Sequence, residues 1–325
     1  MTLRVCAGVI SLATSLALAG TAPAGSADAA RPPEVVPVRV GYTASIFRDI
    51  AESDARAAIK VWAEALAKET EIPASSEVEV LPDAESLAER LQTKRVDFGG
   101  MTTLEFLQIE KKVDLDPMFA VNRGGVATVE YLILVRRDSE YRQLTDLRGA
   151  SLRVFDNPRC SLAIPWVEVL LSEQGIGSAE EFFGRVVPTL KLSAVVLPVF
   201  FGQEKACLVT RDGFQTMAEL NPQVGRELRV LAESPSLIPM VSYFRRDFTP
   251  SFRQELIDAV RNLHASSAGK QILNLMQGDG VVDLLPSALD GTRELVQRWS
   301  HRGTHSGAQT TARRRSAETA DGRDR

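Results

Sequence analysis

Ser151-Leu-Arg-Val-Phe-Asp-Asn-Pro-Arg-Cys-Ser161 is the stretch that decides the architecture of this chain. It has the pattern of a strand that runs into a turn and then into the start of a helix, which we expect over Leu162–Gln174. A helix start presents unpaired backbone N–H groups and the positive end of the helix dipole, and both attract anions. Because Arg159 and Ser161 stand at this start, the segment predicts a strand–turn–helix unit with a seat for an anion.

Strand and helix signals alternate along most of the remaining chain. The other expected strands are Val36–Tyr42, Glu77–Leu81, Val96–Gly100, Pro117–Asn122, Thr128–Arg136, Thr189–Ser193, Ala206–Thr210, Leu228–Ala232 and Pro239–Phe244. The other expected helices are Asp49–Thr70, Ala84–Lys94, Thr102–Lys112, Ser178–Gly184, Ala194–Gly202, Pro250–Ala265 and Ser267–Met276. Strands that alternate with helices predict an α/β fold whose sheets are mostly parallel.

The two ends of the chain differ in composition from its body. Residues Met1–Ala30 combine a basic residue, a short apolar run and small residues in the order of a secretory signal peptide, with cleavage expected after Ala24 or Ala29. From Ser300 to Arg325 hydrophobic periodicity is lost, and we expect a disordered tail. No segment approaches the roughly 20 uninterrupted apolar residues that a membrane-spanning helix needs.

The charge is unevenly distributed. The formal net charge is −4, yet the tail from Ser300 carries six Arg against three acids, so the body carries about −7. A body this acidic argues against nucleic acid as a partner. Aromatic residues make up only 6% of the chain, which argues against a cleft that stacks on sugars.

The residues that catalysis or metal binding would need are scarce. The three histidines are His264, His301 and His305, the last two of which lie in the tail. No nucleotide-binding, hydrolase or metal-ligand motif occurs, so we expect no enzyme activity, no cofactor and no metal site. Of the cysteines, Cys160 and Cys207 remain after processing, and their expected positions at opposite edges of a sheet predict two free thiols.

Six short motifs share the order found in a known family. They are Val38-Arg-Val-Gly-Tyr42, Arg95-Val-Asp-Phe-Gly99 with Thr102-Thr103, Tyr131–Ser139 with Leu144-Thr-Asp-Leu-Arg-Gly149, Glu181-Phe-Phe183, Ala206–Asp212 and Ser234–Pro239. In this order the chain resembles the phosphate/phosphite/phosphonate-binding periplasmic proteins of bacterial ABC importers, over about Val36–Leu285. The resemblance implies a type 2 periplasmic-binding fold, in which two α/β lobes joined by two crossing strands enclose a ligand cleft. The lobes would comprise residues 31–129 plus 232–299 and residues 130–231.

The resemblance also implies ligand-binding positions. The family's Ser-Thr-Ser phosphonate seat is replaced here by Arg159-Cys160-Ser161, and its histidine by Leu192 or Ser193. One family acid survives as Asp212, while a second is missing at Met240, and Met101 replaces an aromatic residue. The expected ligand-binding residues are Tyr42, Thr43, Ser45, Met101, Thr102, Thr103, Arg159, Cys160, Ser161, Ser193, Arg211 and Asp212.

Several of these residues have simpler interpretations. Thr102, Thr103 and Ser161 fit helix N-caps, and an N-cap can also contact an anion. Arg211 could pair with the adjacent Asp212, and Arg159 could face solvent. If they do reach the cleft, the two arginines suit a compact anion, because a guanidinium binds oxyanions in a bidentate manner.

Taken together, these features predict a monomeric periplasmic solute-binding protein of an ABC-type importer that binds a small anion by lobe closure. Its partners would be the permease subunits in the membrane. The alternative is a ligand-sensing module of the same fold that signals to a membrane sensor kinase.

Overall fold

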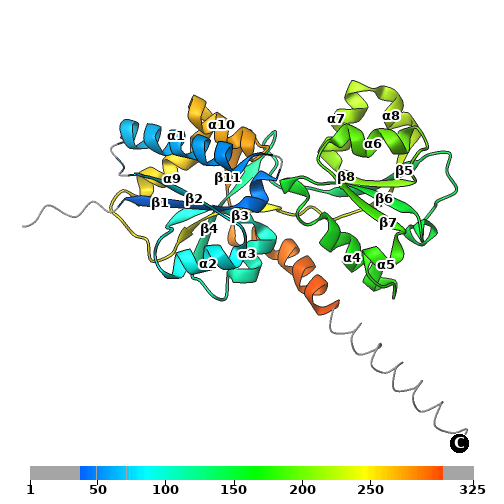
Figure 1. Cartoon of the computed structure of the whole chain (residues 1–325), viewed down its shortest axis with the longest axis horizontal. Coiled ribbons are helices and arrows are strands. Elements are labelled where there is room, and N and C mark those ends of the chain that lie inside the picture. Colours follow the sequence, from blue (N-terminus) through cyan, green and yellow to red (C-terminus); the bar gives the residue numbers. More distant parts are fainter. Residues whose placement is uncertain (1–36, 49, 71, 73, 303–325) are drawn as a thin grey trace, which may run out of the picture. The chain divides into compact units, whose positions relative to one another are not determined.

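The computed structural model describes residues 37–302 except 49, 71 and 73 (Figure 1). The expected signal peptide and the tail beyond residue 302 lie outside the described residues. Within them the chain forms two sheets, each with helices on both faces. We call each sheet with its helices a lobe. No helix in the described part of the chain is long and apolar enough to cross a membrane.

The first lobe has a six-stranded sheet in the order β11-β4-β10-β3-β1-β2. Its strands are β1 (Val38–Thr43), β2 (Ala74–Leu81), β3 (Phe98–Thr102), β4 (Leu115–Asn122), β10 (Met240–Arg245) and β11 (Gly280–Asp283). Its helices are α1 (Glu52–Thr70), α2 (Ala84–Gln92), α3 (Thr103–Ile109), α9 (Arg253–Arg261) and α10 (Ser267–Leu275). One apolar core joins the sheet to α1, α9 and α10, and another joins it to α2 and α3.

The second lobe has a five-stranded sheet in the order β7-β6-β8-β5-β9. Its strands are β5 (Tyr131–Arg136), β6 (Ser151–Phe155), β7 (Arg185–Thr189), β8 (Ala206–Thr210) and β9 (Leu228–Glu233). Its helices are α4 (Ala163–Glu173), α5 (Ala179–Phe182), α6 (Leu192–Phe200), α7 (Arg211–Leu220) and α8 (Pro222–Glu227). Helices α4 and α5 cover one face, and α6, α7 and α8 cover the other (Figure 1).

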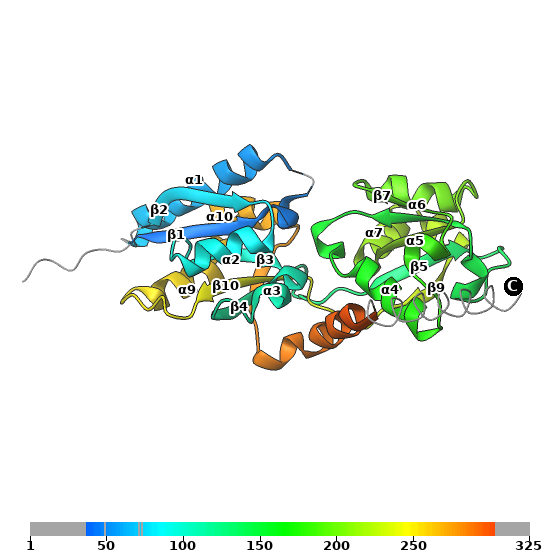
Figure 2. The same ribbon diagram turned by 60° about the horizontal axis from the view of Figure 1, so that its bottom comes forward.

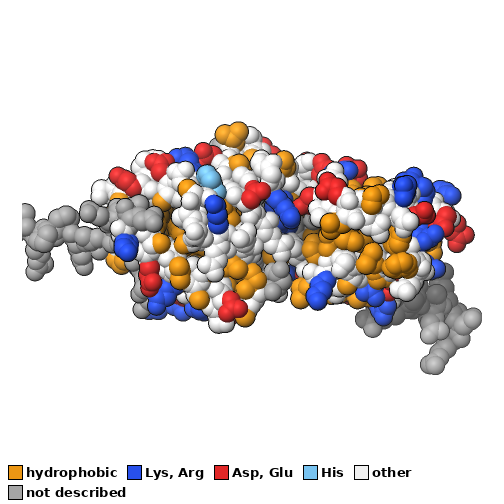
Figure 3. Space-filling model, turned by 90° about the horizontal axis from the view of Figure 1, so that it is seen from above, with side chains coloured by type: hydrophobic (Ala, Val, Ile, Leu, Met, Phe, Trp, Pro, Cys, Tyr) orange, Lys and Arg blue, Asp and Glu red, His pale blue; other side chains and the backbone are white. Residues whose placement is uncertain are grey.

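Charged and hydrophobic side chains are distributed unevenly over the face seen in Figure 3. Acidic and basic side chains are interspersed there, and hydrophobic side chains gather over the half that α6, α7 and α8 cover. Phe201 and Leu220, which follow α6 and end α7, are 64% and 79% exposed.

The expected parallel character of the sheets is wrong. Both sheets are mixed, and five of the nine strand pairs between named strands of the described chain are antiparallel. Four of these five pairs involve β5 or β10, the strands that follow the crossings between the lobes and run opposite to their neighbours. The fifth is the pair of β11 with β4. Alternation along the sequence carries no information about such crossings.

Two further expectations require correction. The strand expected over Thr189–Ser193 is β7 at Arg185–Thr189, because helix α6 already begins at Leu192. Residues 300–302, expected to belong to a disordered tail, are helical, since a helix covers residues 290–302. Figure 2 shows this helix in orange-red beside α4, and its Leu295, Val296 and Trp299 pack into the core that α4 shares with the second sheet.

The parallel pairing of β1 with β3 places the ends of both strands at one edge of the first sheet. Tyr42 is in register with Gly100, so Thr43 and Thr102 lie close to each other at that edge. The two strands approach closely at Gly99, where a Cβ atom would lie 1.6 Å from the carbonyl oxygen of Gly41. Only glycine fits there, which explains the glycine of the Asp97-Phe-Gly99 motif.

The two described cysteines are both buried and free of a disulfide, as expected. Cys160 ends the short helix η3 (Pro158–Cys160), and Cys207 lies in β8, paired with Arg153 of β6. Burial raises the pKa of both thiols, to about 12 in the case of Cys207.

Candidate functional site

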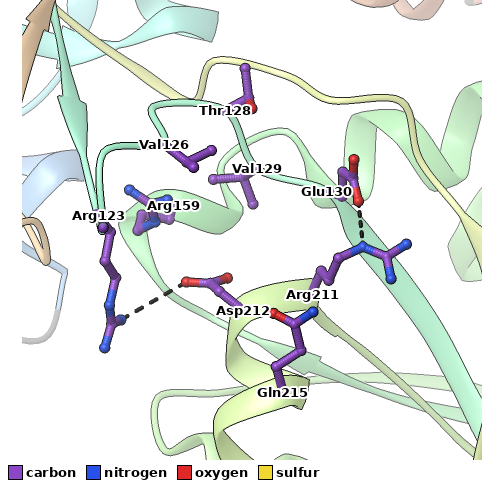
Figure 4. Close-up of a pocket in the computed structure, with 10 residues that line it drawn as sticks. Arg123, Val126, Thr128, Val129, Glu130, Arg159, Arg211, Asp212 and Gln215 are labelled. Carbon is purple, nitrogen blue, oxygen red and sulfur yellow. Dashed lines mark hydrogen bonds and ion pairs between the residues drawn. The ribbon is translucent and has the colours of Figure 1, made fainter.

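A pocket of about 380 Å³ lies between the segment that leads from β4 to β5 and the start of α7 (Figure 4). The connecting segment, residues 123–130, forms one wall. Arg159 of η3 forms another, and Arg211, Asp212 and Gln215 of α7 form the third. Three of the twelve expected ligand-binding residues, Arg159, Arg211 and Asp212, therefore line this pocket.

Arg159 has the most unusual environment of these residues. It is only 4% exposed, and its Nε and Nη1 atoms have no hydrogen-bond partner among the described residues. Burial lowers the pKa of the guanidinium, and the nearby Asp212 partly opposes this effect. A buried charge without partners is costly, so a counter-ion in the pocket would stabilise this side chain.

The backbone around Arg159 is held firmly. Asn157 caps η3 by accepting the Arg159 N–H at 2.9 Å, and Tyr131 donates its hydroxyl to the Arg159 carbonyl oxygen at 2.8 Å. Tyr131 is fully buried in β5, which anchors η3 to the second sheet. The position of Arg159 is therefore fixed by main-chain contacts, while its Nε and Nη1 atoms have no partner in the described part of the chain.

Arg211 is already neutralised by the protein itself. It pairs with Glu130 and with Glu233, so the expected pair with the adjacent Asp212 is not what the structure shows. Glu130 also accepts the Ser236 hydroxyl at 2.7 Å, and this bond, with the help of Arg211, lowers the pKa of the Glu130 carboxyl.

Asp212 pairs instead with Arg123, across a long distance of 3.9 Å between carboxylate oxygen and Nη1 (Figure 4). Both side chains are partly exposed, so the pair is weak and open to competition from a ligand. Arg123 follows β4, whereas Asp212 belongs to α7, so the pair connects residues from the two lobes.

Cys160 and Ser161 line a different cavity, of about 550 Å³. The Ser161 hydroxyl donates to the carbonyl oxygen of Pro239 at 3.1 Å. Ser193 is exposed near the start of α6, while its neighbour Leu192 lines a small cavity of about 90 Å³ that Arg159 and Asp212 also line. The roles of Cys160, Ser161 and Ser193 in ligand binding stay predictions.

The hydroxyl groups expected to bind an anion in the first lobe converge on a carboxylate. Thr43, Ser45 and Thr102 donate their hydroxyls to Glu105 Oε2 at 2.9, 2.6 and 2.7 Å, and the Thr102 N–H adds a fourth bond at 3.0 Å. Thr102 is the N-cap of α3, and Glu105 completes a capping box with it. The negative group that these hydroxyls hold therefore comes from the protein.

The remaining expected residues lie deeper. Tyr42 and Met101 are 3% and 0% exposed within the apolar cores of the first lobe. Thr103 is also fully buried, and its hydroxyl has no partner in the part of the chain that the structure describes. A contact between these three residues and a ligand stays a prediction.

Four residues of the pocket and of the group of hydroxyls around Glu105 were not expected from the sequence: Glu105, Arg123, Glu130 and Gln215. The spacing Thr102-x-x-Glu105 is a capping-box signature and could have revealed Glu105. Arg123, Glu130 and Gln215 carry no such signal, because their roles depend on how the crossing segment meets α7. No group of three or more His, Cys, Asp or Glu in the described residues could hold a metal ion.

The fold agrees with a comparison against protein families. The family described as "ABC transporter, phosphonate, periplasmic substrate-binding protein" matches residues 46–289, which is more than half of the chain. The chain belongs to this phosphonate-binding family. Its members are periplasmic solute-binding proteins of ABC importers, so the family resemblance expected from the sequence is confirmed.

Solved structures show the same fold at low sequence identity. XAC2383 from Xanthomonas citri bound to chloride is 19% identical with a TM-score of 0.59, and the match covers 82% of this chain and 99% of that one. PhnD1 from Prochlorococcus marinus in complex with methylphosphonate is 16% identical with a TM-score of 0.54, covering 81% and 98%. A phosphonate transporter component from Pseudomonas aeruginosa is 13% identical with a TM-score of 0.54, covering 89% and 99%. No curated protein matches the sequence. The fold is that of the type 2 periplasmic-binding proteins, as expected.

Proposed function

We propose that this protein captures a small anion in the pocket around Arg159 and delivers it to the permease subunits of an ABC importer. The observation that carries the proposal is the side chain of Arg159, which is buried, lines the pocket and has two nitrogen atoms, Nε and Nη1, without partners among the described residues. A small anion would supply the missing charge and the missing acceptors. Charge-assisted hydrogen bonds in a desolvated pocket are strong, so Arg159 would provide most of the affinity.

Membership of the family supports the transport role, because its members serve ABC importers. We infer that closure of the lobes completes the site, as in other two-lobed binding proteins. Arg123 is suited to this step, because its weak pair with Asp212 joins the lobes beside Arg159. The protein would then bind its ligand without transforming it.

The proposal is tested by replacing Arg159 and measuring binding by isothermal titration calorimetry. The panel would contain phosphate, methylphosphonate, short sulfonates and short carboxylates. We expect Arg159→Ala to weaken every bound anion by about tenfold or more, since a hydrogen bond to a charged group contributes about 1.5–3 kcal/mol. Arg226→Ala, which removes an exposed arginine of the same lobe, is the matched control.

Two results would overturn the proposal. One is an unchanged affinity in Arg159→Ala. The other is a wild-type protein that binds no member of the panel at millimolar concentration. Circular dichroism of both variants establishes that the fold is retained.

A further inference from the structure

The charges around the pocket indicate how much negative charge a ligand can carry, if the function proposed above is correct. The charged lining residues are the arginines Arg123, Arg159 and Arg211 and the carboxylates Glu130 and Asp212. They leave one net positive charge. Arg123 pairs with Asp212, and Arg211 pairs with Glu130 and also with Glu233, a carboxylate outside the lining that brings the sum for the whole cluster to zero. Arg159 has no carboxylate partner among the described residues, so the unpaired positive charge resides on it.

A singly charged ligand would neutralise Arg159. A second negative charge on the same group would have to compete with Asp212 for Arg123 and would lie near Asp212, which lines the same two cavities as Arg159. Like charges brought together in a partly desolvated site repel each other strongly. Asp212 therefore opposes doubly charged oxyanions.

The rest of the lining is suited to a short aliphatic group. Val126 and Val129 face the pocket from the crossing segment, and Gln215 and Thr128 add neutral hydrogen-bonding groups (Figure 4). Val126 is 56% exposed, so a ligand could cover apolar surface that water now reaches. A volume of about 380 Å³ is at the small end of ligand sites.

We propose that the ligand is a singly charged oxyanion on a short aliphatic body, such as a carboxylate or a sulfonate, and that Asp212 is the residue that discriminates against dianions. The specificity of this pocket would thus differ from that implied by the phosphonate-binding family name. A planar carboxylate matches the guanidinium fork, and a sulfonate presents the same single charge.

The test uses three probes that share a propyl group: butyrate, propane-1-sulfonate and propylphosphonate. Affinities are measured by calorimetry at pH 6.0 and pH 8.5. Butyrate and the sulfonate carry one charge at both values, whereas the phosphonate loses its second proton within this range. We expect the affinity of the phosphonate to fall about threefold with the rise in pH, because about a third of it remains a monoanion at pH 8.5, and the better of the other two to change by less than 1.5-fold.

The titratable groups around Arg159 do not explain such a fall. Its ionisable neighbours are Asp212, Arg123, Tyr131 and Cys160. Burial raises the pKa of the Tyr131 hydroxyl and of the Cys160 thiol, so neither loses its proton below pH 8.5. Glu130 remains ionised throughout, because its pKa is lowered. The sulfonate keeps one charge at both pH values, so any change in its affinity measures the effect of pH on the protein itself.

Asp212→Asn tests the discriminating residue directly. We expect this variant to bind the phosphonate dianion at pH 8.5 at least fivefold more tightly than the wild type does, with a smaller gain for butyrate. Asp138→Asn removes an exposed carboxylate that pairs with Arg136 in the same lobe and serves as the control.

The outcomes separate this inference from the proposed function. If the phosphonate dianion binds as tightly as the monoanions, or if Asp212→Asn leaves its affinity unchanged, the inference is wrong and the anion-binding function stands. If no probe binds the wild type and phosphate also fails to bind, both are wrong.

Discussion

At the scale of single residues, Arg159 and Glu105 behave in opposite ways. Arg159 is a buried cation that lacks partners among the described residues, whereas Glu105 is a carboxylate that collects four hydrogen bonds on one oxygen. The sequence places both at helix starts, and a helix start alone does not reveal which charge the protein supplies. The helix start of the first lobe therefore already holds a carboxylate of the protein, whereas two nitrogen atoms of Arg159 in the second lobe have no partner among the described residues.

Replacing Glu105 tests this interpretation. We expect Glu105→Ala to lower the free energy of unfolding by about 1–2 kcal/mol, because three hydroxyls and the N-cap of α3 lose their acceptor. Urea denaturation measures this loss. Glu85→Ala, which removes an exposed pair with Lys112, should change stability by at most about 0.5 kcal/mol.

The same variant distinguishes structural from ligand-binding hydroxyls. We expect its affinity for anions to match that of the wild type. A gain in affinity would mean that Thr43, Ser45 and Thr102 can bind an anion once Glu105 is removed.

At the scale of elements, the helix over residues 290–302 ties its end of the chain to the second lobe. The helix begins against the first lobe, where Thr292 is 1% exposed and accepts the N–H of Ile238 at 3.0 Å. Farther along, Arg298 pairs with Glu173 of α4, and Arg302 pairs with the buried Glu168. The helix therefore contributes to a core assembled mostly from residues more than 100 positions earlier.

This contribution can be measured with Leu295, which is 5% exposed in that core. We expect Leu295→Ala to lower the free energy of unfolding by about 2–4 kcal/mol, through lost burial and a residual cavity. Leu285→Ala, at a position 68% exposed, is the matched control and should change little. Equal stability of the two variants would show that the helix does not support the second lobe.

Local patterns in the sequence were sufficient for most elements but not for their pairing. Strand β8 was expected at its observed bounds, Ala206–Thr210, because five apolar or β-branched positions stand between clear breaks. Helix α7 was missed, since Gly213 and a polar surface hide its pattern, and it has no buried residue. The direction of β5 and β10 and the contact between Arg123 and Asp212 depend on the chain crossing between sheets, which no local pattern records.

At the scale of the whole molecule, the two sheets have similar arrangements of strands but are built from different residues. Each has a parallel group of three strands, β2-β1-β3 and β7-β6-β8, bordered by strands that run antiparallel. The family resemblance predicted two such lobes, because its motifs follow one another in order. The resemblance could not predict which lobe has a cation without a partner among the described residues, because Arg159 stands where the family has a hydroxyl.

Both described thiols belong to the second lobe and are inaccessible in the folded state. Their raised pKa values keep them protonated at pH 8, and burial shields them from reagents. We expect iodoacetamide at pH 8 to modify Cys160 and Cys207 only at the rate at which this lobe opens. Peptide mapping by mass spectrometry measures each site separately, and modification as fast as that of a small-molecule thiol would contradict the expectation.

Because the first lobe contributes no cysteine over its described residues, the two thiols form a natural kinetic reporter for one half of the molecule. Cys160 directly follows the arginine that we assign to the anion, whereas Cys207 lies inside a strand. A bound anion that stabilises only the pocket against local opening would slow the labelling of Cys160 alone. One that steadies the entire lobe would slow both, so the ratio of the two rates shows how far the effect of the bound ion spreads.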